Sequence, residues 1–447
     1  MLHAFLLGLE DEAQIKAGPL TRVFELRTNP FKESRVLITG VTGFAGPHLA
    51  RSLVEDGAEV YGLVRRRSDG NLRRGLQDVG IQDQVKTLEG SMEDLTSLLT
   101  ALDKSMPDYV FHLAAQSFVE RSFDNPLETF QTNATGTTNL LEALRLKDKI
   151  DARFVFAGSS EEYGLVIMSK KQLTDYGKNK GCVFPWPKRI PELPVAETNP
   201  LRPMSPYAVT KVYGEHITLN FQRSYSLNGL VTRSFNHEGA RRGSMFVTSV
   251  ISRQVVQLRY GEIDSITVGN VGAFRDWSHI DDIVDGYKLA AAKGAKGDVY
   301  NLGSERTNSV LTYLLWALEE SGFEINNLIT HNGGTKIIKP AEVVLLRKFD
   351  KEFVSSRVDK MLLNEEVSFG LGDRGLEIAT NKGIVKVNFD ERRFRPAEVP
   401  VLLSDTTKAK NKIGFLPSHS VNDIIKDQLN YFAVPERRGL TQRNRPR

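Results

Sequence analysis

A chain of 447 residues is longer than one hydrophobic core usually organises, so the sequence predicts a large α/β domain that carries a smaller one or long insertions. Apolar residues make up 40% and charged residues 26% of the chain, ordinary values for a soluble globular protein. The net charge of +4 is spread along the sequence, which argues against a nucleic-acid partner, and the single cysteine, Cys182, excludes an intramolecular disulfide and a cysteine metal site.

The first 34 residues are expected to form an N-terminal extension. Residues 2–9 are apolar, but they lack a basic leader, are too short to span a bilayer and run into three acidic residues. Because an unpaired cysteine also fits a reducing compartment, we expect a cytoplasmic protein with no membrane contact. At the other end, residues 436–447 are predicted to be a solvated basic tail.

From residue 35 onward, short aliphatic runs alternate with amphipathic stretches of roughly ten to twenty residues. This alternation predicts a Rossmann-type, doubly wound parallel sheet covered by helices, which is expected to form a ligand-binding domain over residues 35–235. Ligands of such sheets bind in the crevice at the carboxyl ends of the strands. The expected strands are residues 36–39, 59–64, 85–88, 109–113, 154–157 and 230–234.

Two stretches interrupt the alternation. Residues 167–194 are rich in Lys, Gly and Pro without a clear period, which predicts a loop inserted between a strand and the next helix. Residues 327–386 mix short apolar runs with charge and are interpreted as a second insertion. It falls within residues 236–435, predicted to form mainly a smaller α/β substrate-binding lobe, with some segments returning to the Rossmann domain.

A glycine-rich turn follows the first predicted strand. Its three glycines have G-x-x-G-x-x-G spacing and precede an amphipathic helix. A tight turn needs residues without Cβ, and the helix amino terminus attracts phosphate, so the turn predicts a bound dinucleotide. The expected cofactor contacts are Gly40, Val41, Thr42, Gly43, Phe44, Ala45 and Gly46.

Two arginines, Arg65 and Arg66, follow the second predicted strand. NAD-preferring folds place a carboxylate at about this position, where it binds the ribose 2′-hydroxyl. A guanidinium there would instead form bidentate hydrogen bonds with a 2′-phosphate, which favours NADP over NAD. The alternative is that these arginines belong to a solvated basic loop.

The predicted catalytic residues lie at two places in the chain. Tyr207 and Lys211 stand four residues apart on one face of a predicted helix, where an ammonium can stabilise a phenolate that takes a proton from a sugar hydroxyl. Ser159, Ser160 and Glu161 follow the fifth predicted strand and so face the crevice. A serine hydroxyl can bind the oxygen being oxidised, and Glu161 can move a proton on the adjacent carbon. The alternative for Glu161 is a solvated loop acid.

Several motifs resemble the extended short-chain dehydrogenases that act on nucleotide sugars, and most closely the GDP-mannose 4,6-dehydratases. They are L-A-A-Q-S at 113–117, F-N-H-E-G-A-R-R-G at 235–243, G-N-V-G-A-F-R-D-W-S-H at 269–279 and R-F-R-P-A-E-V at 393–399. The family's catalytic loop commonly reads S-T-S-E, and this sequence has G-S-S-E at 158–161.

The resemblance implies further site residues. On the cofactor side they are Leu113, Ala114, Ala115, Gln116, Ser117, Tyr207, Lys211, His237 and Arg242. On the substrate side, for the nucleotide diphosphate and base, they are Asn236, Val247, Arg275, Arg395 and Glu398. No metal site is implied.

The resemblance also implies the reaction: an NADP-dependent hydro-lyase that converts GDP-mannose to GDP-4-keto-6-deoxymannose by internal hydride transfer. Such a product is a precursor of deoxyhexoses, and the family suggests a homodimer or homotetramer. The alternatives are a nucleotide-sugar epimerase, reductase or decarboxylase with the same Tyr207 and Lys211 pair, or a non-catalytic sensor of NADP or a sugar nucleotide. Glu161 favours elimination over epimerisation or reduction, since neither of these needs a carboxylate base at that position.

Overall fold

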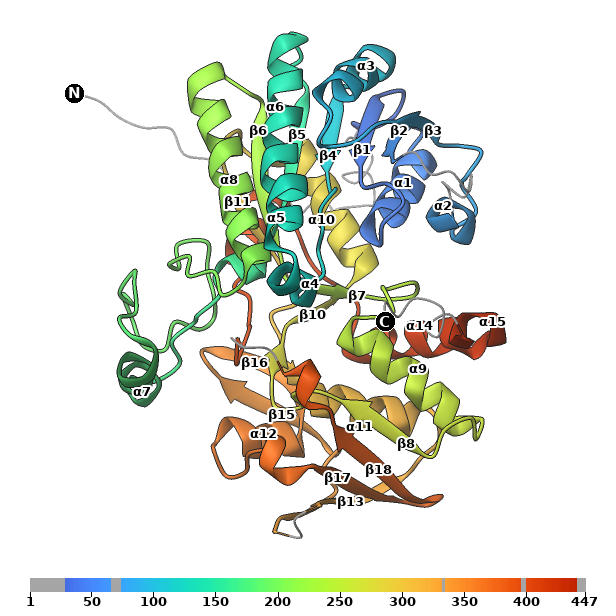
Figure 1. Ribbon diagram of the computed structural model, residues 1–447, viewed down its shortest axis with the longest axis vertical. Helices are drawn as coiled ribbons and strands as arrows, with labels where there is room; N and C mark the ends of the chain where they lie inside the picture. Colours follow the sequence, from blue (N-terminus) through green and yellow to red (C-terminus); the bar gives the residue numbers. More distant parts are fainter. Residues whose placement is uncertain (1–28, 66–73, 332–333, 395–398, 440–447) are drawn as a thin grey trace, which may run out of the picture.

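The computed structural model describes residues 29–65, 74–331, 334–394 and 399–439 (Figure 1). A parallel sheet with helices on both faces fills the upper half of Figure 1, and a second sheet with its own helices lies below it. The predicted extension at residues 1–34 lies almost entirely outside the described residues, as does part of the predicted basic tail.

The upper sheet confirms the predicted doubly wound fold. It has seven strands, all paired in parallel, in the order β11-β6-β5-β4-β1-β2-β3. Six of them match the predicted strands, whose aliphatic residues are buried on both faces; β11 was not predicted. The strands are β1 (Arg35–Thr39), β2 (Glu59–Val64), β3 (Lys86–Glu89), β4 (Tyr109–His112), β5 (Arg153–Ser159), β6 (Gly229–Ser234) and β11 (Val299–Leu302).

Helices cover both faces of this sheet and bury separate hydrophobic clusters against it. One face is covered by α1 (Ala45–Glu55), α10 (Ile280–Lys293) and α13 (Thr407–Ile413), and the other by α3 (Leu95–Ser105), α6 (Gly136–Leu146) and α8 (Pro206–Tyr225). The strand order reverses between β1 and β4, so the crevice for a ligand opens at their carboxyl ends.

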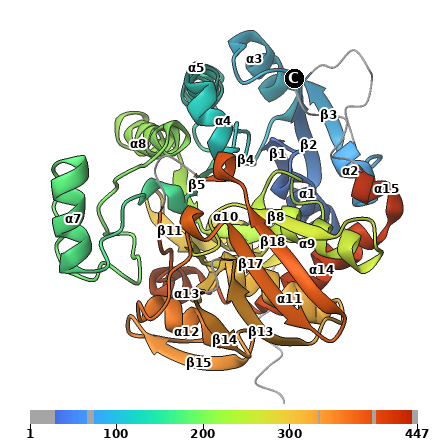
Figure 2. The same ribbon diagram turned by 60° about the horizontal axis from the view of Figure 1, so that its bottom comes forward.

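The lower half is a mixed sheet packed on three helices (Figure 2). Its strand order is β14-β13-β17-β18-β8, with only β18 and β8 parallel. The strands are β8 (Ser265–Val268), β13 (Ile325–Thr330), β14 (Lys336–Ile338), β17 (Gly375–Thr380) and β18 (Gly383–Phe389), and the helices are α9 (Val247–Arg259), α11 (Val310–Glu320) and α14 (Val421–Ala433). The stretch 327–386, interpreted as an insertion, therefore supplies much of this sheet.

Smaller elements complete the architecture and connect the two halves. They are α2 (Arg74–Asp78), α4 (Val119–Asp124), α5 (Pro126–Phe130), β7 (Asn236–Glu238), β9 (Phe274–Arg275), β10 (Trp277–His279), β12 (Asn308–Ser309), β15 (Val343–Lys348), β16 (Lys351–Ser356), α12 (Arg357–Leu363) and α15 (Pro435–Arg438). Of these, β7 and β10 pair in parallel directly below the carboxyl edge of the upper sheet.

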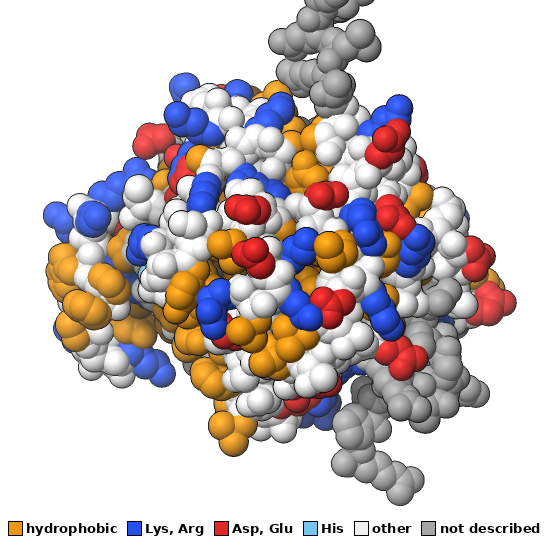
Figure 3. Space-filling view, turned by 90° about the horizontal axis from the view of Figure 1, so that it is seen from above, with side chains coloured by type: hydrophobic (Ala, Val, Ile, Leu, Met, Phe, Trp, Pro, Cys, Tyr) orange, Lys and Arg blue, Asp and Glu red, His pale blue; other side chains and the backbone are white. Residues whose placement is uncertain are grey.

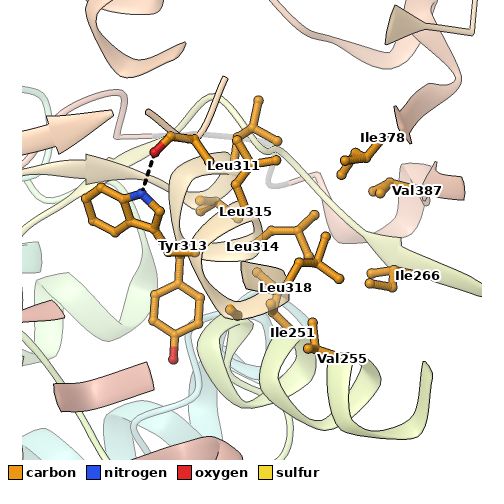
Figure 4. Close-up of a cluster of buried hydrophobic side chains, with 14 of the residues drawn as sticks. Ile251, Val255, Ile266, Leu311, Tyr313, Leu314, Leu315, Leu318, Ile378 and Val387 are labelled. Atoms are coloured by element: carbon orange, nitrogen blue, oxygen red, sulfur yellow. Dashed lines mark hydrogen bonds between the residues drawn. The ribbon is translucent and has the colours of Figure 1, made fainter. Parts of the chain in front are cut away.

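The lower core depends on α11, which is buried along most of its length. Figure 4 shows Leu314 and Leu318 pointing toward the aliphatic side chains of the sheet, including Ile266 and Val387. Replacing Leu314, which is 0% exposed, by alanine is expected to cost about 2–5 kcal/mol of unfolding free energy through lost burial and a residual cavity. Chemical denaturation measures this cost.

The matched control for that variant is Leu416→Ala, because Leu416 is 65% exposed. It should change the unfolding free energy by less than about 0.5 kcal/mol. Equal losses in the two variants would contradict the assignment of α11 to the core.

The prediction that residues 167–194 are a loop is wrong in one part. The structure has an eleven-residue helix there, α7 (Lys170–Lys180), which begins where the Ser169 hydroxyl accepts the Gln172 N–H at 3.1 Å. None of its residues is buried, and it projects from the body of the molecule (Figures 1 and 2). It packs on the body through Leu173 and Tyr176, which are only partly buried, so its apolar stripe is too weak for periodicity to reveal the helix.

The surface fits the even charge distribution of the sequence. In Figure 3, positive and negative side chains are interspersed over the face seen from above. Over the described residues, no helix combines the length and the hydropathy needed to cross a bilayer.

Candidate active site

The glycine-rich turn lies at the carboxyl end of β1, against the segment after β4. Gly40 has φ +76°, and a Cβ there would lie 2.8 Å from the Ala114 nitrogen, so only glycine fits. The Ala114 N–H also donates to the Thr39 hydroxyl at 3.2 Å. Two predicted cofactor segments, residues 40–46 and 113–117, therefore meet at one edge of the sheet.

His237 and Arg242 lie over this turn. The Phe44 ring stacks on His237 with centroids 6.0 Å apart, and the Arg242 guanidinium lies 5.0 Å from the Phe44 centroid and 3.6 Å from that of Phe246. Burial and the nearby Arg242 charge lower the pKa of His237 to about 3, so its imidazole is neutral. The structure thus brings together cofactor residues that are about 200 positions apart in the chain.

Of the two predicted 2′-phosphate arginines, Arg65 is exposed at the end of β2, and Arg66 lies outside the described residues. A third arginine, Arg241, lies closer to the turn. A Cβ on Gly75 would lie 2.8 Å from the Thr42 carbonyl oxygen and 3.0 Å from Arg241 Nη2, so the guanidinium and the turn meet at Gly75. The double arginine of the 235–243 motif was the sequence signal for Arg241.

The surroundings of Arg241 test whether a dinucleotide fits. Its Nε donates to Asp78 at 3.1 Å, whereas its Nη1 is buried and has no hydrogen-bond partner among the described residues. A buried, unpaired guanidinium N–H is costly, and a phosphate oxygen at the neighbouring turn would satisfy it. The site therefore fits a phosphate-bearing cofactor.

Arg241→Ala is expected to weaken dinucleotide binding by about tenfold or more, because a hydrogen bond to a charged group contributes roughly 1.5–3 kcal/mol. Calorimetric titration with NADP⁺ measures the loss. The control is Arg357→Ala, which removes an exposed arginine paired with Glu342 at 3.3 Å in the lower half. Unchanged affinity in Arg241→Ala would show that this guanidinium serves only its ion pair with Asp78.

Tyr207 and Lys211 are held in the first turns of α8, which begins where the Ser205 hydroxyl accepts the Ala208 N–H at 3.1 Å. Both side chains are buried, at 8% and 6% exposure. Lys211 Nζ donates to the Ala157 carbonyl at 2.6 Å and lies 5.9 Å from the Tyr207 ring centroid. The helical spacing thus places the ammonium beside the phenol, as predicted.

Burial dominates the protonation of this pair. It lowers the pKa of Lys211 to about 8, against the opposing effect of Glu162, because an ammonium loses its hydration. It raises the pKa of Tyr207 for the same reason, while a hydrogen bond with Ser159 acts in the opposite direction. Tyr207 is therefore a neutral phenol until further positive charge arrives next to it.

Ser159, Ser160 and Glu161 follow β5 as predicted, but they differ in accessibility. The Ser159 hydroxyl accepts the Glu161 N–H at 3.2 Å and faces Tyr207. Burial is the main cause of the raised pKa of Tyr207, and the partly exposed Glu161 carboxylate is near enough to add to it, whereas Ser159 opposes it. Ser160 is buried. Ser159, Glu161, Tyr207 and Lys211 therefore form one cluster at the sheet edge.

The predicted substrate residues continue this site toward the lower half. Asn236 lies in β7, and its Oδ1 is buried without a hydrogen-bond partner among the described residues. Val247 begins α9, and Arg275 Nη1 donates to the carbonyls of Phe274 at 2.9 Å and Val399 at 2.7 Å. Arg395 and Glu398 lie outside the described residues.

Sequence reasoning missed a second residue besides Arg241. Glu162, next to the predicted base, is completely buried behind Ser159. Its neighbour Glu161 was predicted from its place after the fifth strand, while nothing in the local sequence signals that Glu162 points inward. Within the described ranges, no group of three His, Cys, Asp or Glu side chains could hold a metal ion.

Comparison with known proteins extends these observations. Residues 36–303 match the NAD dependent epimerase/dehydratase family, and residues 350–428 match GDP-mannose 4,6 dehydratase. The chain is 32% identical to GDP-mannose 4,6-dehydratase of Sinorhizobium fredii, over 88% of this chain and 96% of that protein. It is 29% identical to human GDP-mannose 4,6 dehydratase, over 88% of this chain and 90% of the human one.

Solved structures agree on the fold. RMD from Pseudomonas aeruginosa, complexed with NADPH, is 20% identical and superposes with a TM-score of 0.61 over 90% of this chain and 99% of its own. UDP-glucose 4-epimerase of Thermus thermophilus, complexed with NAD, is also 20% identical, with a TM-score of 0.62 over the same shares. At this identity the likeness establishes the shared fold.

Proposed function

Because the chain belongs to the NAD-dependent epimerase/dehydratase family and, within it, to the GDP-mannose 4,6-dehydratases, we propose that it converts GDP-mannose to GDP-4-keto-6-deoxymannose. The observation that carries this proposal is the cluster of Ser159, Glu161, Tyr207 and Lys211 at the carboxyl edge of the sheet. It combines a phenol for oxidation with a carboxylate for elimination.

We propose NADP as the cofactor, held by the glycine turn and the segment 113–117, with His237, Arg241 and Arg242 above the turn. The basic side chains around the turn and at the end of β2 support NADP over NAD, since arginine binds a 2′-phosphate in bidentate fashion. When bound, this cofactor supplies a hydride acceptor and donor, so the overall reaction needs no external oxidant.

In the first step, the phenolate form of Tyr207 accepts the proton of the sugar C4 hydroxyl, and C4 becomes a ketone as it gives up a hydride, which the bound dinucleotide would take. The positive charges of Lys211 and of the oxidised nicotinamide ring counter the burial that keeps the phenol neutral. The Ser159 hydroxyl, which faces Tyr207, donates a hydrogen bond to the C4 oxygen.

The ketone at C4 acidifies the C5–H bond, and Glu161 removes that proton. The C5–H electron pair forms a C5=C6 double bond as the C6 hydroxyl leaves, and an acid near Ser159 protonates it to water. Ser160, the other predicted candidate, is buried and so less suited to this contact. Glu161 then returns its proton to C5, and a hydride at C6, which the bound dinucleotide would supply, would complete the 4-keto-6-deoxy sugar.

We propose that Asn236, Val247 and Arg275 bind the sugar and nucleotide on the side facing the lower half, together with Arg395 and Glu398. The buried, unpaired Oδ1 of Asn236 supports a polar ligand at that place. A guanidinium suits the diphosphate of such a ligand, because its planar set of donors can bind two oxygens at once.

We further propose that the enzyme works in the cytoplasm as a homodimer or homotetramer and serves deoxyhexose biosynthesis. The lone Cys182 supports a reducing compartment, and the family likeness supports the oligomer. Equilibrium sedimentation of the purified chain tests the oligomeric state.

A mass-spectrometric assay tests the reaction. The purified protein is incubated with GDP-mannose and, separately, with dTDP-, UDP- and CDP-glucose, with catalytic NADP⁺ only. We expect loss of one water from GDP-mannose alone. Parallel incubations with a UDP-uronic acid and with added NADPH test the alternatives: loss of carbon dioxide would identify a decarboxylase, and consumption of NADPH a reductase. An isomer of unchanged mass, separated by chromatography, would identify an epimerase. Tight NADP⁺ binding without any turnover would identify a sensor.

A further inference from the structure

A second carboxyl group, that of Glu162, lies directly behind the catalytic loop. Glu162 is 0% exposed, and its Oε1 accepts the Ser159 N–H at 2.7 Å. The Ser159 hydroxyl in turn accepts hydrogen bonds from the main chain of the short 3₁₀ turn Ser160–Glu162. This reciprocal cap fixes the main chain on which the Ser159 side chain stands.

The space for this carboxyl group is created by Gly158. A Cβ at this residue would lie 2.6 Å from Glu162 Oε1, so glycine and the inward-facing glutamate fit each other. In the family's usual S-T-S-E loop a serine stands at the position of Gly158. The G-S-S-E-E sequence of this chain therefore builds a contact that a side chain at position 158 would block.

On its far side the carboxyl group faces a buried ion pair. Arg233 donates to both oxygens of Glu215, at 2.7 Å and 2.6 Å, while its Nε is 3.8 Å from Glu162 Oε2, beyond hydrogen-bond range. Arg233 also donates to the Tyr163 hydroxyl at 2.9 Å. The Arg233 guanidinium thus lies near two buried carboxyl groups, but it hydrogen-bonds only with that of Glu215.

These contacts decide which carboxyl group carries the charge. Burial raises the pKa of Glu162 well above its ordinary value, and the charge of Glu215 raises it further. For Glu215, burial is outweighed by the hydrogen bonds and charge of Arg233, which lower its pKa. Glu162 is therefore a neutral acid beside an ionised Glu215, and its O–H can hydrogen-bond with that carboxylate.

The same group acts on the catalytic pair. In its ionised form, Glu162 would oppose the lowered pKa of Lys211 and would add, after burial and Glu161, to the raised pKa of Tyr207. Its carboxyl group therefore lies close to both. A substitution of Glu162 should therefore change the reactivity of the Tyr207 phenol as well as the stability of the fold.

We propose that Glu162 is a positioning residue: through the Ser159 main chain it aims the Ser159 hydroxyl at Tyr207, with Arg233 and Glu215 holding its far side. The proposal rests on the proposed function for what Ser159 and Tyr207 do. If Glu162 had a purely structural role, replacing it would lower the stability of the fold. It would neither lower kcat selectively over KM nor shift the pH profile of kcat.

The test compares Glu162→Leu, which removes the hydrogen bonds, with Glu162→Gln, which keeps an acceptor for Ser159 and a donor for Glu215. We expect Glu162→Leu to lower kcat for GDP-mannose dehydration about tenfold, with KM changed less than about twofold. The reason is that the hydrogen bond from the Ser159 N–H to the carboxyl group of Glu162 is lost. Its kcat–pH profile should shift, because Tyr207 loses its ordered partner. Glu162→Gln should recover kcat to within about threefold of the wild type and restore the profile.

The matched control is Asp359→Asn. Asp359 is also a buried carboxylate that accepts a main-chain N–H, that of Ser309 at 3.1 Å, but it lies in the lower half. The Asp359→Asn variant should have a lower melting temperature than the wild type but the same kcat–pH profile. Where Glu162→Leu does not fold, Glu162→Met, unbranched and of similar length, is measured in its place.

Two results would overturn the proposal: wild-type kcat and pH profile in the apolar variant, or a loss in Glu162→Gln as large as in Glu162→Leu. A wild-type protein that dehydrates no nucleotide sugar would overturn the proposed function instead. In that case crystal structures of the wild type and the apolar variant decide the matter. A Ser159 hydroxyl that keeps its place beside Tyr207 in the variant would refute the role of Glu162.

Discussion

Replacing Glu161 by glutamine is expected to lower the rate of water loss from GDP-mannose by about a thousandfold, within the range that a general base contributes. Glutamine keeps the size and partial exposure of this side chain but cannot accept the C5 proton. Dinucleotide affinity should stay at the wild-type value, because Glu161 is not among the proposed cofactor contacts. Mass spectrometry of the product and calorimetric titration of NADP⁺ measure the two effects.

The same variant should still oxidise the sugar at C4, since Tyr207, Lys211 and Ser159 are unchanged. Elimination is blocked, so reduced nicotinamide and the 4-keto hexose should accumulate to at most one equivalent per site, visible as near-ultraviolet absorbance. The control is Glu324→Gln, an exposed glutamate just before β13, which should behave as the wild type. Undiminished dehydration by Glu161→Gln would remove Glu161 from the mechanism.

Tyr207→Phe is the second variant with a large expected effect, a loss of about two to four orders of magnitude in kcat. The phenylalanine ring fills the same buried volume, but no group remains to take the C4 hydroxyl proton. Unlike Glu161→Gln, this variant should give no reduced nicotinamide, because the block precedes hydride transfer. Single-turnover absorbance therefore separates the two steps.

The control for Tyr207→Phe is Tyr213→Phe on the same helix. The Tyr213 hydroxyl lies 2.9 Å from the Thr138 hydroxyl at a partly exposed site, away from Ser159. Its loss should change kcat less than about twofold, since an exposed hydrogen bond contributes little. If both variants lose activity equally, the effect belongs to α8 as a whole and not to the phenol of Tyr207.

Much of the upper half could be predicted from the sequence, because its signals are local. Each buried parallel strand, such as β2, is a short aliphatic run, and the glycine spacing at residues 40–46 directly reports a turn that Cβ atoms would block. The four-residue spacing of Tyr207 and Lys211 fixes their common helical face before any tertiary contact exists. From these features the sequence predicted the edge of the sheet at which the cofactor is expected to bind, and the pairing of Tyr207 with Lys211.

Other parts of the fold could not be predicted, because their sequence lacks a period. The helix α7 has no fully buried residue and packs through the partly buried Leu173 and Tyr176, so its apolar stripe is weak. The strands of the lower sheet are short, and β13 pairs with β17 about fifty residues later in the chain. Pairing at that separation is selected by burial against α11 and not by either strand alone.

What the sequence determined by itself is the type of sheet, the glycine turn and the common helical face of Tyr207 and Lys211, since each depends on residues that are neighbours along the chain. Only the tertiary structure decided that Glu162 faces inward to Arg233, that Arg241 reaches the glycine turn and that Ser160 is buried. Burial and charge are set by residues brought together from distant segments. They determine pKa and accessibility, and no local pattern encodes them.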